Sequence, residues 1–246
     1  GFDQIVQAEA GLMSLVGDPD GEPTRVGLPI ADTLAGMFGA YGVVLALRER
    51  DRTGRGGAVD TSLLAAVVAV HTFHGAGWLT AGVEPRRTGN RHPSICPYGT
   101  YSCRDGDLVI AVGSESLWRR FAEVVGLDPD RPDLSTNARR VAAVDRVEKE
   151  ITELLADRSV EEVLAELLDA GVPAGRIRSL PEVYTWEQVR HQQLVHAMEH
   201  PLLGPVAVPG SALRLDGMPL VSDLAPPVLG ADDERWDRLW TEEETA

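Results

Sequence analysis

Cysteine is scarce in this sequence, which has only Cys96 and Cys103 among 246 residues. Two cysteines cannot form the set of disulfides that stabilises small secreted proteins, so a disulfide framework is excluded as the basis of the fold. We therefore expect two reduced thiols in a cytoplasmic protein.

Long hydrophobic runs are also lacking. The longest run, from Leu63 to Val70, continues only loosely toward Leu79 and is too short to cross a bilayer, so it predicts a buried helix. The chain does not open with the basic, apolar and small-residue segments of a signal peptide. We therefore expect no membrane partner.

Positive charge is in deficit, because 23 Lys and Arg residues face 38 Asp and Glu residues, giving a formal net charge of −15. This balance argues against nucleic acids and anionic membranes as main partners, although local arginines can still bind a phosphorylated ligand. The length allows one large domain or two smaller ones. An initiator methionine is lacking as well, and we expect the chain to begin within a domain.

The first third of the sequence predicts helices. Residues 3–16 and 33–50 have the apolar spacing of helices, and residues 25–30 are expected to be extended between them. The helix over 33–50 has small residues on one face, so we expect another backbone to pack close against it. Its glycines cost up to about 1 kcal/mol each, which packing must compensate. A further apolar helix is expected to reach roughly Leu79.

The middle of the chain predicts a small α+β domain over residues 85–175. A hairpin is expected at residues 98–112 with its turn at Asp105-Gly106, since Asp-Gly between β-rich segments favours a hairpin. Helices are expected near 115–126, 138–156 and 160–170, the last with a capping box at Ser159 and Glu162. Beyond this domain we expect a helix over 180–194, a strand pair turning at Gly204-Pro205, and a short terminal helix within 232–246.

Asp32 lies where the extended segment meets the helix that follows it. A carboxylate there is near unpaired N–H groups and the positive end of the helix dipole. Two interpretations are open at this point. Asp32 is either a helix cap or a carboxylate nucleophile placed where donors stabilise developing charge.

The ordered set of motifs resembles the family III CoA-transferases, a group that includes formyl-CoA transferase, the carnitine CoA-transferases and α-methylacyl-CoA racemase. The matching stretches are Gly1-Phe2-Asp3, Gln7-Ala8, Gly11-Leu12-Met13-Ser14, Ile30-Ala31-Asp32 with Gly36, Arg48-Glu49-Arg50, Thr53-Gly54-Arg55-Gly56, Val59-Asp60-Thr61-Ser62-Leu63, Gly89-Asn90-Arg91-His92-Pro93, Pro97-Tyr98, Ala170-Gly171-Val172-Pro173-Ala174-Gly175, and His200-Pro201 with Leu203-Gly204. No single motif is decisive, but their order and spacing agree over nearly the whole chain.

The resemblance implies that Asp32 is the nucleophile of a CoA-transferase. In this chemistry the carboxylate attacks an acyl-CoA thioester, and CoA then moves to a second carboxylic acid through covalent aspartyl intermediates. An Asp suits the reaction because it is ionised at neutral pH and needs no base. Acyl-CoA and a carboxylic acid are the expected substrates, and no tightly bound cofactor is expected.

Two other functions remain open. One is a non-catalytic subunit that stabilises a homologous active partner, and the other is an acyl-CoA racemase or lyase with Asp32 as its base. Racemases of the family have a His where this chain has Phe2. Phe cannot move a proton, so a two-base mechanism is disfavoured.

The resemblance also implies that part of the family fold is missing. Family members have an N-terminal Rossmann-like portion with much of the CoA-binding surface, and this chain resembles only the C-terminal portion of such a protein. We expect a partial fold of mixed α/β and α+β class. Residues 1–84 and 176–246 form part of the large domain, and residues 85–175 form the small α+β domain. A separate N-terminal subunit or a homologous partner is expected, in an interlocked dimer-like assembly.

Further residues are candidates for binding substrate or CoA. Phe2 is expected near the thioester, although it could also belong to the core, and Leu63 falls where the family places an apolar side chain near the adenine. The remaining candidates face the expected cleft from the small domain: Tyr98, Gly99, Gly113, Ser114 and Glu115. We expect no metal site, because His71 and His74 have no further ligand at a suitable spacing.

Overall fold

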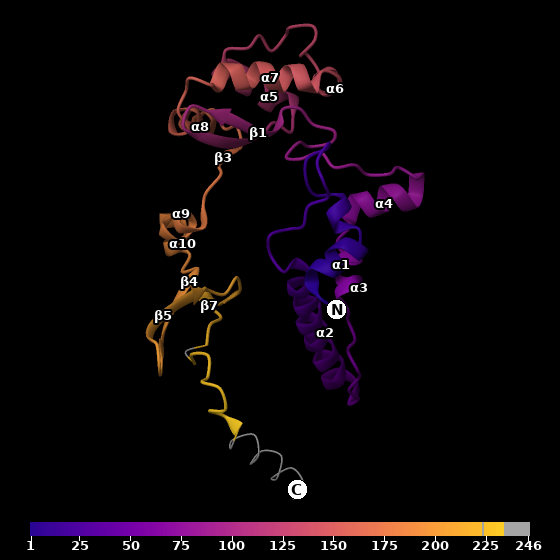
Figure 1. The fold of residues 1–246 in the computed structure, drawn as a ribbon, viewed down its shortest axis with the longest axis vertical. Helices are drawn as coiled ribbons and strands as arrows, with labels where there is room; N and C mark the ends of the chain where they lie inside the picture. Colours follow the sequence, from indigo (N-terminus) through magenta and orange to yellow (C-terminus); the bar gives the residue numbers. More distant parts are fainter. Residues whose placement is uncertain (223, 234–246) are drawn as a thin grey trace, which may run out of the picture. The chain divides into compact units, whose positions relative to one another are not determined.

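The computed structural model describes residues 1–222 and 224–233 (Figure 1). The chain divides into two units, Gly1–Arg176 and a second that begins at Ile177, and each is described by itself. The terminal helix expected within 232–246 falls mostly on residues outside the described part.

The first unit opens with a helical portion. Its elements are α1 (Asp3–Glu9), the 3₁₀ helix η1 (Leu12–Ser14), α2 (Ile30–Thr53), α3 (Leu63–Ala69) and α4 (Thr72–Ala81). Helix α2 ends at Gly54, whose φ of 75° reverses the chain in a conformation that only glycine adopts without strain. The single apolar helix expected up to Leu79 is wrong in one respect: it is broken into α3 and α4, which are bent by 78°.

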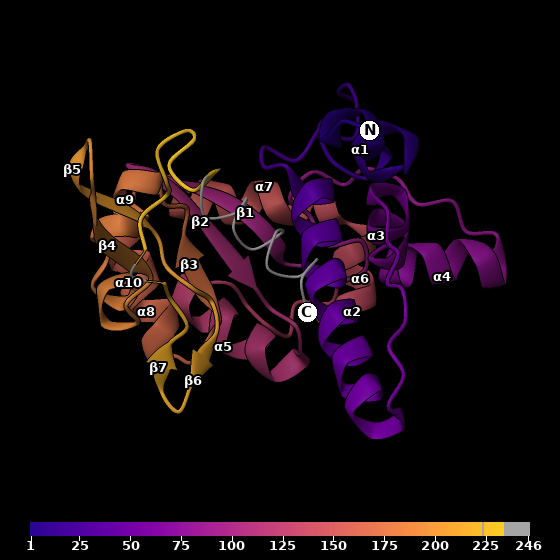
Figure 2. The same cartoon turned by 90° about the horizontal axis from the view of Figure 1, so that it is seen from below.

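Helices α1, α2 and α3 pack around a small cluster made by Ala10, Ala31 and Val67, and Figure 2 shows α2 and α3 side by side. The expected close approach to the small residues of α2 is confirmed at one position. A Cβ on Gly42 would lie only 2.6 Å from Cγ1 of Val59, so the segment before α3 needs a glycine there.

Most of α2 is nevertheless uncovered in this chain. Within the described residues, α2 is the only unbroken helix that is long and apolar enough to cross a membrane. Of its most apolar stretch of 18 residues, 6% is buried. The expectation that residues 63–70 form the longest apolar run is therefore wrong, because residues 34–47 of α2 carry no charge and are interrupted only by glycines. Large side chains on α2 face solvent, among them Met37, Tyr41 and Val44.

The small domain is built on a three-stranded antiparallel sheet of β1 (Tyr98–Cys103), β2 (Gly106–Ala111) and β3 (Ala174–Arg176). The expected hairpin is confirmed, but its turn lies one residue earlier than predicted. Cys103 pairs with Gly106, so the turn residues are Arg104 and Asp105. Strand β3 was not predicted, because three residues are too few to show alternation.

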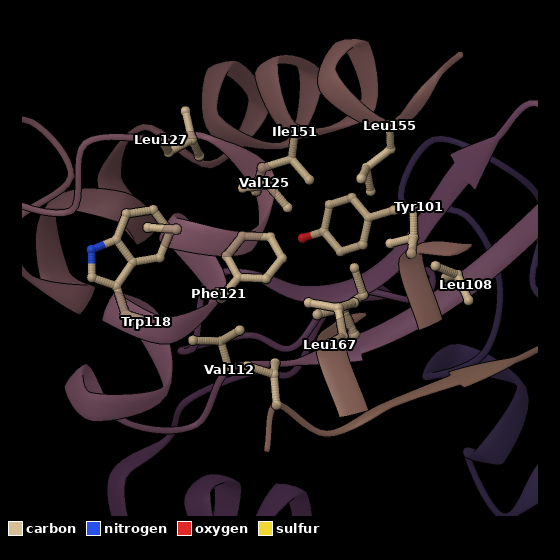
Figure 3. Packing of buried hydrophobic residues seen from close by; sticks show 14 of the residues in the cluster. Tyr101, Leu108, Val112, Trp118, Phe121, Val125, Leu127, Ile151, Leu155 and Leu167 are labelled. Carbon is tan, nitrogen blue, oxygen red and sulfur yellow. The ribbon is translucent and has the colours of Figure 1, made fainter. Parts of the chain in front are cut away.

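Four helices, α5 (Glu115–Val125), α6 (Asn137–Ala142), α7 (Val144–Leu155) and α8 (Val160–Asp169), cover this sheet. Their apolar faces meet β1 and β2 in the main core of the chain, where Phe121, Ile151 and Leu167 surround the ring of Tyr101 (Figure 3). The helix expected over 138–156 is interrupted at Ala143. Both cysteines are free, as expected, and Cys96 is buried.

The second unit contains short elements only. They are α9 (Leu180–Thr185), α10 (Glu187–His191), β4 (Val195–His200), β5 (Gly204–Pro209), β6 (Arg214–Leu215) and β7 (Met218–Pro219). The helix expected over 180–194 is split at Trp186, which has extended backbone angles. The expected strand pair is β4 and β5, with Gly204 opening β5 opposite His200. Whether this unit joins residues 1–84 in one large domain stays a prediction.

Candidate functional site

Asp32 is the third residue of α2, and its side chain is exposed. Among the described residues the carboxylate has no hydrogen-bond or ion-pair partner. The interpretation of Asp32 as a helix cap is therefore wrong.

Asp3, which lies 28 residues before Ala31, provides the cap instead. Its Oδ1 accepts hydrogen bonds from the backbone N–H groups of Ala31, at 2.7 Å, and of Asp32, at 3.3 Å. The N–H of Ile30 donates to the carbonyl of Leu28, and the helical bonds begin with the N–H of Thr33. Every donor in the first turn is thus in use, and the two that bond a side chain, from Ala31 and Asp32, bond Asp3, whereas the sequence suggested that they serve Asp32.

The environment of Asp3 favours its charged form. Partial burial works to raise the pKa of this carboxyl, but hydrogen bonds from the Gln7 side chain and from two backbone N–H groups outweigh it. The pKa of Asp3 therefore lies below its usual value. A negative charge held at the N-terminus of a helix also interacts favourably with the helix dipole.

Phe2 and Leu63 lie in the same region as Asp32. Phe2 precedes α1 and is 82% exposed, so it is not a core residue. Leu63 opens α3 and packs against the cluster that contains Ala31, the neighbour of Asp32. A Cβ on Gly1 would lie 3.5 Å from Cδ1 of Leu63, which places the start of the chain beside this leucine. The structure thus places Leu63 and the backbone of Asp32 at the junction of α1, α2 and α3, and Phe2 directly precedes α1 there.

Tyr98 and Gly99 lie at the start of β1. The Tyr98 ring stacks on His92, with centroids 5.1 Å apart. A Cβ on Gly99 would approach the carbonyl oxygen of Asn90 to 3.2 Å, so the crossing segment and the strand run close together. Both residues therefore shape the crossing segment, and their contact with substrate stays a prediction.

The segment Gly113-Ser114-Glu115 has structural partners in the small domain. The Ser114 hydroxyl accepts a hydrogen bond from the N–H of Leu117 and caps α5. Glu115 accepts a hydrogen bond from the N–H of Asn137, at 2.7 Å, and pairs with Arg140, at 3.0 Å. Burial works to raise the pKa of Glu115, but these two interactions lower it below its usual value. Within the described residues no hydrogen bond or ion pair joins this segment to Asp32.

The sequence reasoning missed the roles of Asp3 and Gln7. A visible signal existed, because the two polar residues are four apart in a short helix and both belong to the motif that opens the chain. No group of three His, Cys, Asp or Glu side chains in the described part of the chain is arranged to hold a metal ion. His71 instead hydrogen-bonds the carbonyl of Ala10 at 2.9 Å.

Comparison with known proteins identifies the family of this chain. The sequence matches CoA-transferase family III over residues 1–233. It is 36% identical over 235 residues to succinyl-CoA:glutarate CoA-transferase of Mus musculus, covering 94% of this chain and 53% of that protein. It is 30% identical over 223 residues to acetyl-CoA:oxalate CoA-transferase of Acetobacter aceti, covering 88% and 55%.

The fold has solved counterparts too. The structure of a CAIB/BAIF family protein from Brucella suis superposes with a TM-score of 0.84 at 28% identity, covering 97% of this chain and 62% of that one. The predicted fold class is confirmed. The chain spans about half the length of the curated relatives that it matches.

Proposed function

Because this chain belongs to CoA-transferase family III, we propose that it contributes the catalytic carboxylate of an enzyme that moves CoA between two carboxylic acids. The exposed and unpartnered carboxylate of Asp32, on a helix whose first turn is already capped, is the observation that carries this proposal. A nucleophile must be accessible and must not be consumed by structural hydrogen bonds.

In the proposed reaction an Asp32 oxygen attacks the thioester carbonyl carbon. The C–S bond breaks, and an acyl-aspartyl anhydride and CoA thiolate form. The thiolate then attacks the aspartyl carbonyl and releases the first acid, leaving an aspartyl-CoA thioester. The acceptor carboxylate repeats these two steps in reverse order, which forms the new acyl-CoA and restores the Asp32 carboxylate.

Dicarboxylic acids are the proposed substrate class. The name of one relative pairs succinyl-CoA with glutarate and that of the other pairs acetyl-CoA with oxalate, so the free acid in each pair is a dicarboxylate. The strong net negative charge of the chain makes local cationic groups necessary for binding such acids.

A further polypeptide portion is proposed to complete the enzyme. The apolar side chains on α2 face solvent here, and the matched relatives have almost as much chain again as the part that aligns. Exposed apolar surface of this extent marks a contact with other protein. We propose that the additional portion covers α2 and forms the rest of the CoA site, as a separate subunit or as part of a longer chain.

The test is to trap the covalent intermediate in the enzyme as purified from its own host. Succinyl-CoA is added with glutarate or oxalate, hydroxylamine or borohydride is used to trap, and peptides are analysed by mass spectrometry. We expect the label on Asp32 and loss of CoA transfer in Asp32→Asn. The matched control is Asp169→Asn at the exposed end of α8.

Unlabelled Asp32 with full turnover in Asp32→Asn would reject the proposal. Turnover that depends on another polypeptide's Asp would instead support the non-catalytic subunit. Exchange of solvent deuterium into the α-carbon without an acceptor acid would support a racemase or lyase.

A further inference from the structure

Gln7 has the most completely buried polar side chain in the described part of the chain, at 0% exposure. A buried amide costs free energy unless its donors and acceptor are paired. Its Nε2 donates to Asp3 Oδ2 at 2.7 Å and to the carbonyl of Leu28 at 3.3 Å. Its Oε1 accepts a hydrogen bond from the N–H of Val26 at 2.9 Å. The amide is therefore satisfied on both ends.

These bonds tie two segments that meet at the start of α2. One is α1, which carries Gln7 and Asp3, and the other is the extended stretch through Val26 and Leu28 that leads into α2. The bond to Oδ2 also fixes how the Asp3 carboxylate is turned, so that its other oxygen faces the N–H groups of Ala31 and Asp32.

Asp32 would compete for the same N–H groups. An acidic side chain at the third position of a helix lies close to the free donors of the first turn and readily accepts hydrogen bonds from them. A carboxylate bound in this way shares its charge with the donors and is a weaker nucleophile. Because Asp3 already accepts from these donors, none of them is left to hydrogen-bond the Asp32 carboxylate.

We propose that Gln7 is a positioning residue for Asp32: by holding Asp3 over the first N–H groups of α2, it keeps the Asp32 carboxylate free for reaction. This inference rests on the proposed function only for its catalytic meaning. The structural part of the inference does not depend on that function: Gln7 holds Asp3, and through Asp3 it affects Asp32, to which Gln7 makes no hydrogen bond itself.

The test replaces Gln7 by Met, which has similar length and no donor. The titration of the Asp32 carboxyl carbon is followed by ¹³C NMR, with the signal assigned by its loss in Asp32→Asn. Once the N–H groups are released, they stabilise the charged form of Asp32, so the titration midpoint in Gln7→Met should lie at lower pH than in the wild type. Turnover should fall several-fold through kcat, with KM little changed.

Two further variants separate positioning from general stability. Val67→Ala removes buried apolar contact from the same helix cluster without touching the polar network, so it should lower the melting temperature and leave the Asp32 midpoint in place. In an Asp3→Ala background, adding Gln7→Met should produce no further movement of the midpoint, because the residue through which Gln7 acts is gone.

If Gln7→Met does not fold, Gln7→Asn provides the same test, since its amide is one methylene too short to reach Asp3. An unchanged midpoint in the folded Gln7 variant, or an equal movement in Val67→Ala, would overturn the inference. A moved midpoint with full turnover would overturn the catalytic role of Gln7. Failure to label Asp32 in the trapping experiment would reject the proposed function and leave the titration result standing.

Discussion

Tyr101 carries an unpaired polar group in the main core. Its hydroxyl is buried and has no hydrogen-bond partner among the described residues, and Figure 3 shows it directed among apolar side chains. Burial, followed by the negative charge of Glu148, raises the pKa of this phenol well above its usual value. The hydroxyl therefore stays neutral and contributes a desolvation cost without a compensating bond.

We predict that Tyr101→Phe keeps the ring packing and raises the free energy of unfolding by about 1 kcal/mol, because an unsatisfied hydroxyl is removed from the core. Urea denaturation measures the change. Phe121→Leu serves as the control at a neighbouring core position and should be destabilising, since it removes apolar volume. A clear loss of stability in Tyr101→Phe would mean that the hydroxyl is satisfied in solution.

Cys96 gives a prediction about pH. Burial of the thiol, together with the nearby negative charge of Glu148, raises the pKa of Cys96 to about 11. The folded state thus holds its proton more tightly than the unfolded state does. Stability from this source is fully present below the unfolded pKa of about 8.5 and is lost as pH rises toward 11.

We predict that the free energy of unfolding falls between pH 9 and 11 more steeply in the wild type than in Cys96→Ala, by about 2–3 kcal/mol over the range. Denaturation curves of both proteins at several pH values give the difference, in which the other titrating groups cancel. Parallel pH profiles would show that the thiol is accessible to solvent.

At the scale of elements, α6 is fixed to the domain by Arg140. This guanidinium is 1% exposed and donates to the carbonyls of Cys96, at 2.8 Å, and Leu134, at 2.7 Å. It also pairs with Glu115, and its Cζ lies 4.4 Å from the centre of the Trp118 ring. One side chain therefore connects α6 to the segment before β1 and to α5.

We predict that Arg140→Met lowers the free energy of unfolding by about 3 kcal/mol, because two buried carbonyls and a carboxylate lose their donor. Glu115→Gln should cost only about 1 kcal/mol, since this carboxylate is half exposed and the other bonds of Arg140 remain. Thermal or urea denaturation distinguishes the two. Equal effects of the two variants would show that the ion pair, and not the carbonyl contacts, holds α6.

The same elements show how far the sequence predicts the fold. Apolar periodicity predicted the long helices, and the Asp105-Gly106 pair predicted the hairpin. Both patterns are local, so they can be read from neighbouring residues. The breaks at His71, Ala143 and Trp186 were missed, and at His71 a bond to the carbonyl of Ala10, 61 residues earlier, accompanies the break. Strand β3 is visible only through its pairing with β2.

The candidate site also has one part that the sequence predicted and one part that it missed. The resemblance pointed to Asp32, whose carboxylate is exposed in the structure, and its catalytic role stays a prediction. The capping role was wrongly considered for Asp32, because the true cap, Asp3, comes from 28 residues away. A capping bond of that span leaves no trace in the residues around the helix, whereas a local cap such as Ser114 does.

For the molecule as a whole, uncovered apolar surface is the main feature of this chain. In the second unit Val189 is the only hydrophobic side chain that is buried among the described residues, and its strands pair only two by two. Isolated pairs of strands are marginally stable in water. Helix α2 in the first unit is equally exposed. Both units therefore expose apolar surface that the further polypeptide portion proposed above would cover.

Because α2 is exposed in this chain, a substitution on it can test assembly of the enzyme without changing the stability of the chain itself. Val44 on α2 is 62% exposed, so Val44→Lys should change the free energy of unfolding of this chain alone by less than about 0.5 kcal/mol. In the complete enzyme the new ammonium group would be buried without a partner against the covering polypeptide, which is strongly unfavourable. We therefore predict that the variant loses most CoA-transfer activity when purified from its own host, and that a smaller species accumulates on size exclusion.

Lys149→Glu, on an exposed face of α7, should change neither property. Full activity and unchanged size in Val44→Lys would show that this face of α2 stays in water in the working enzyme, and the proposed covering portion would have to contact the chain elsewhere.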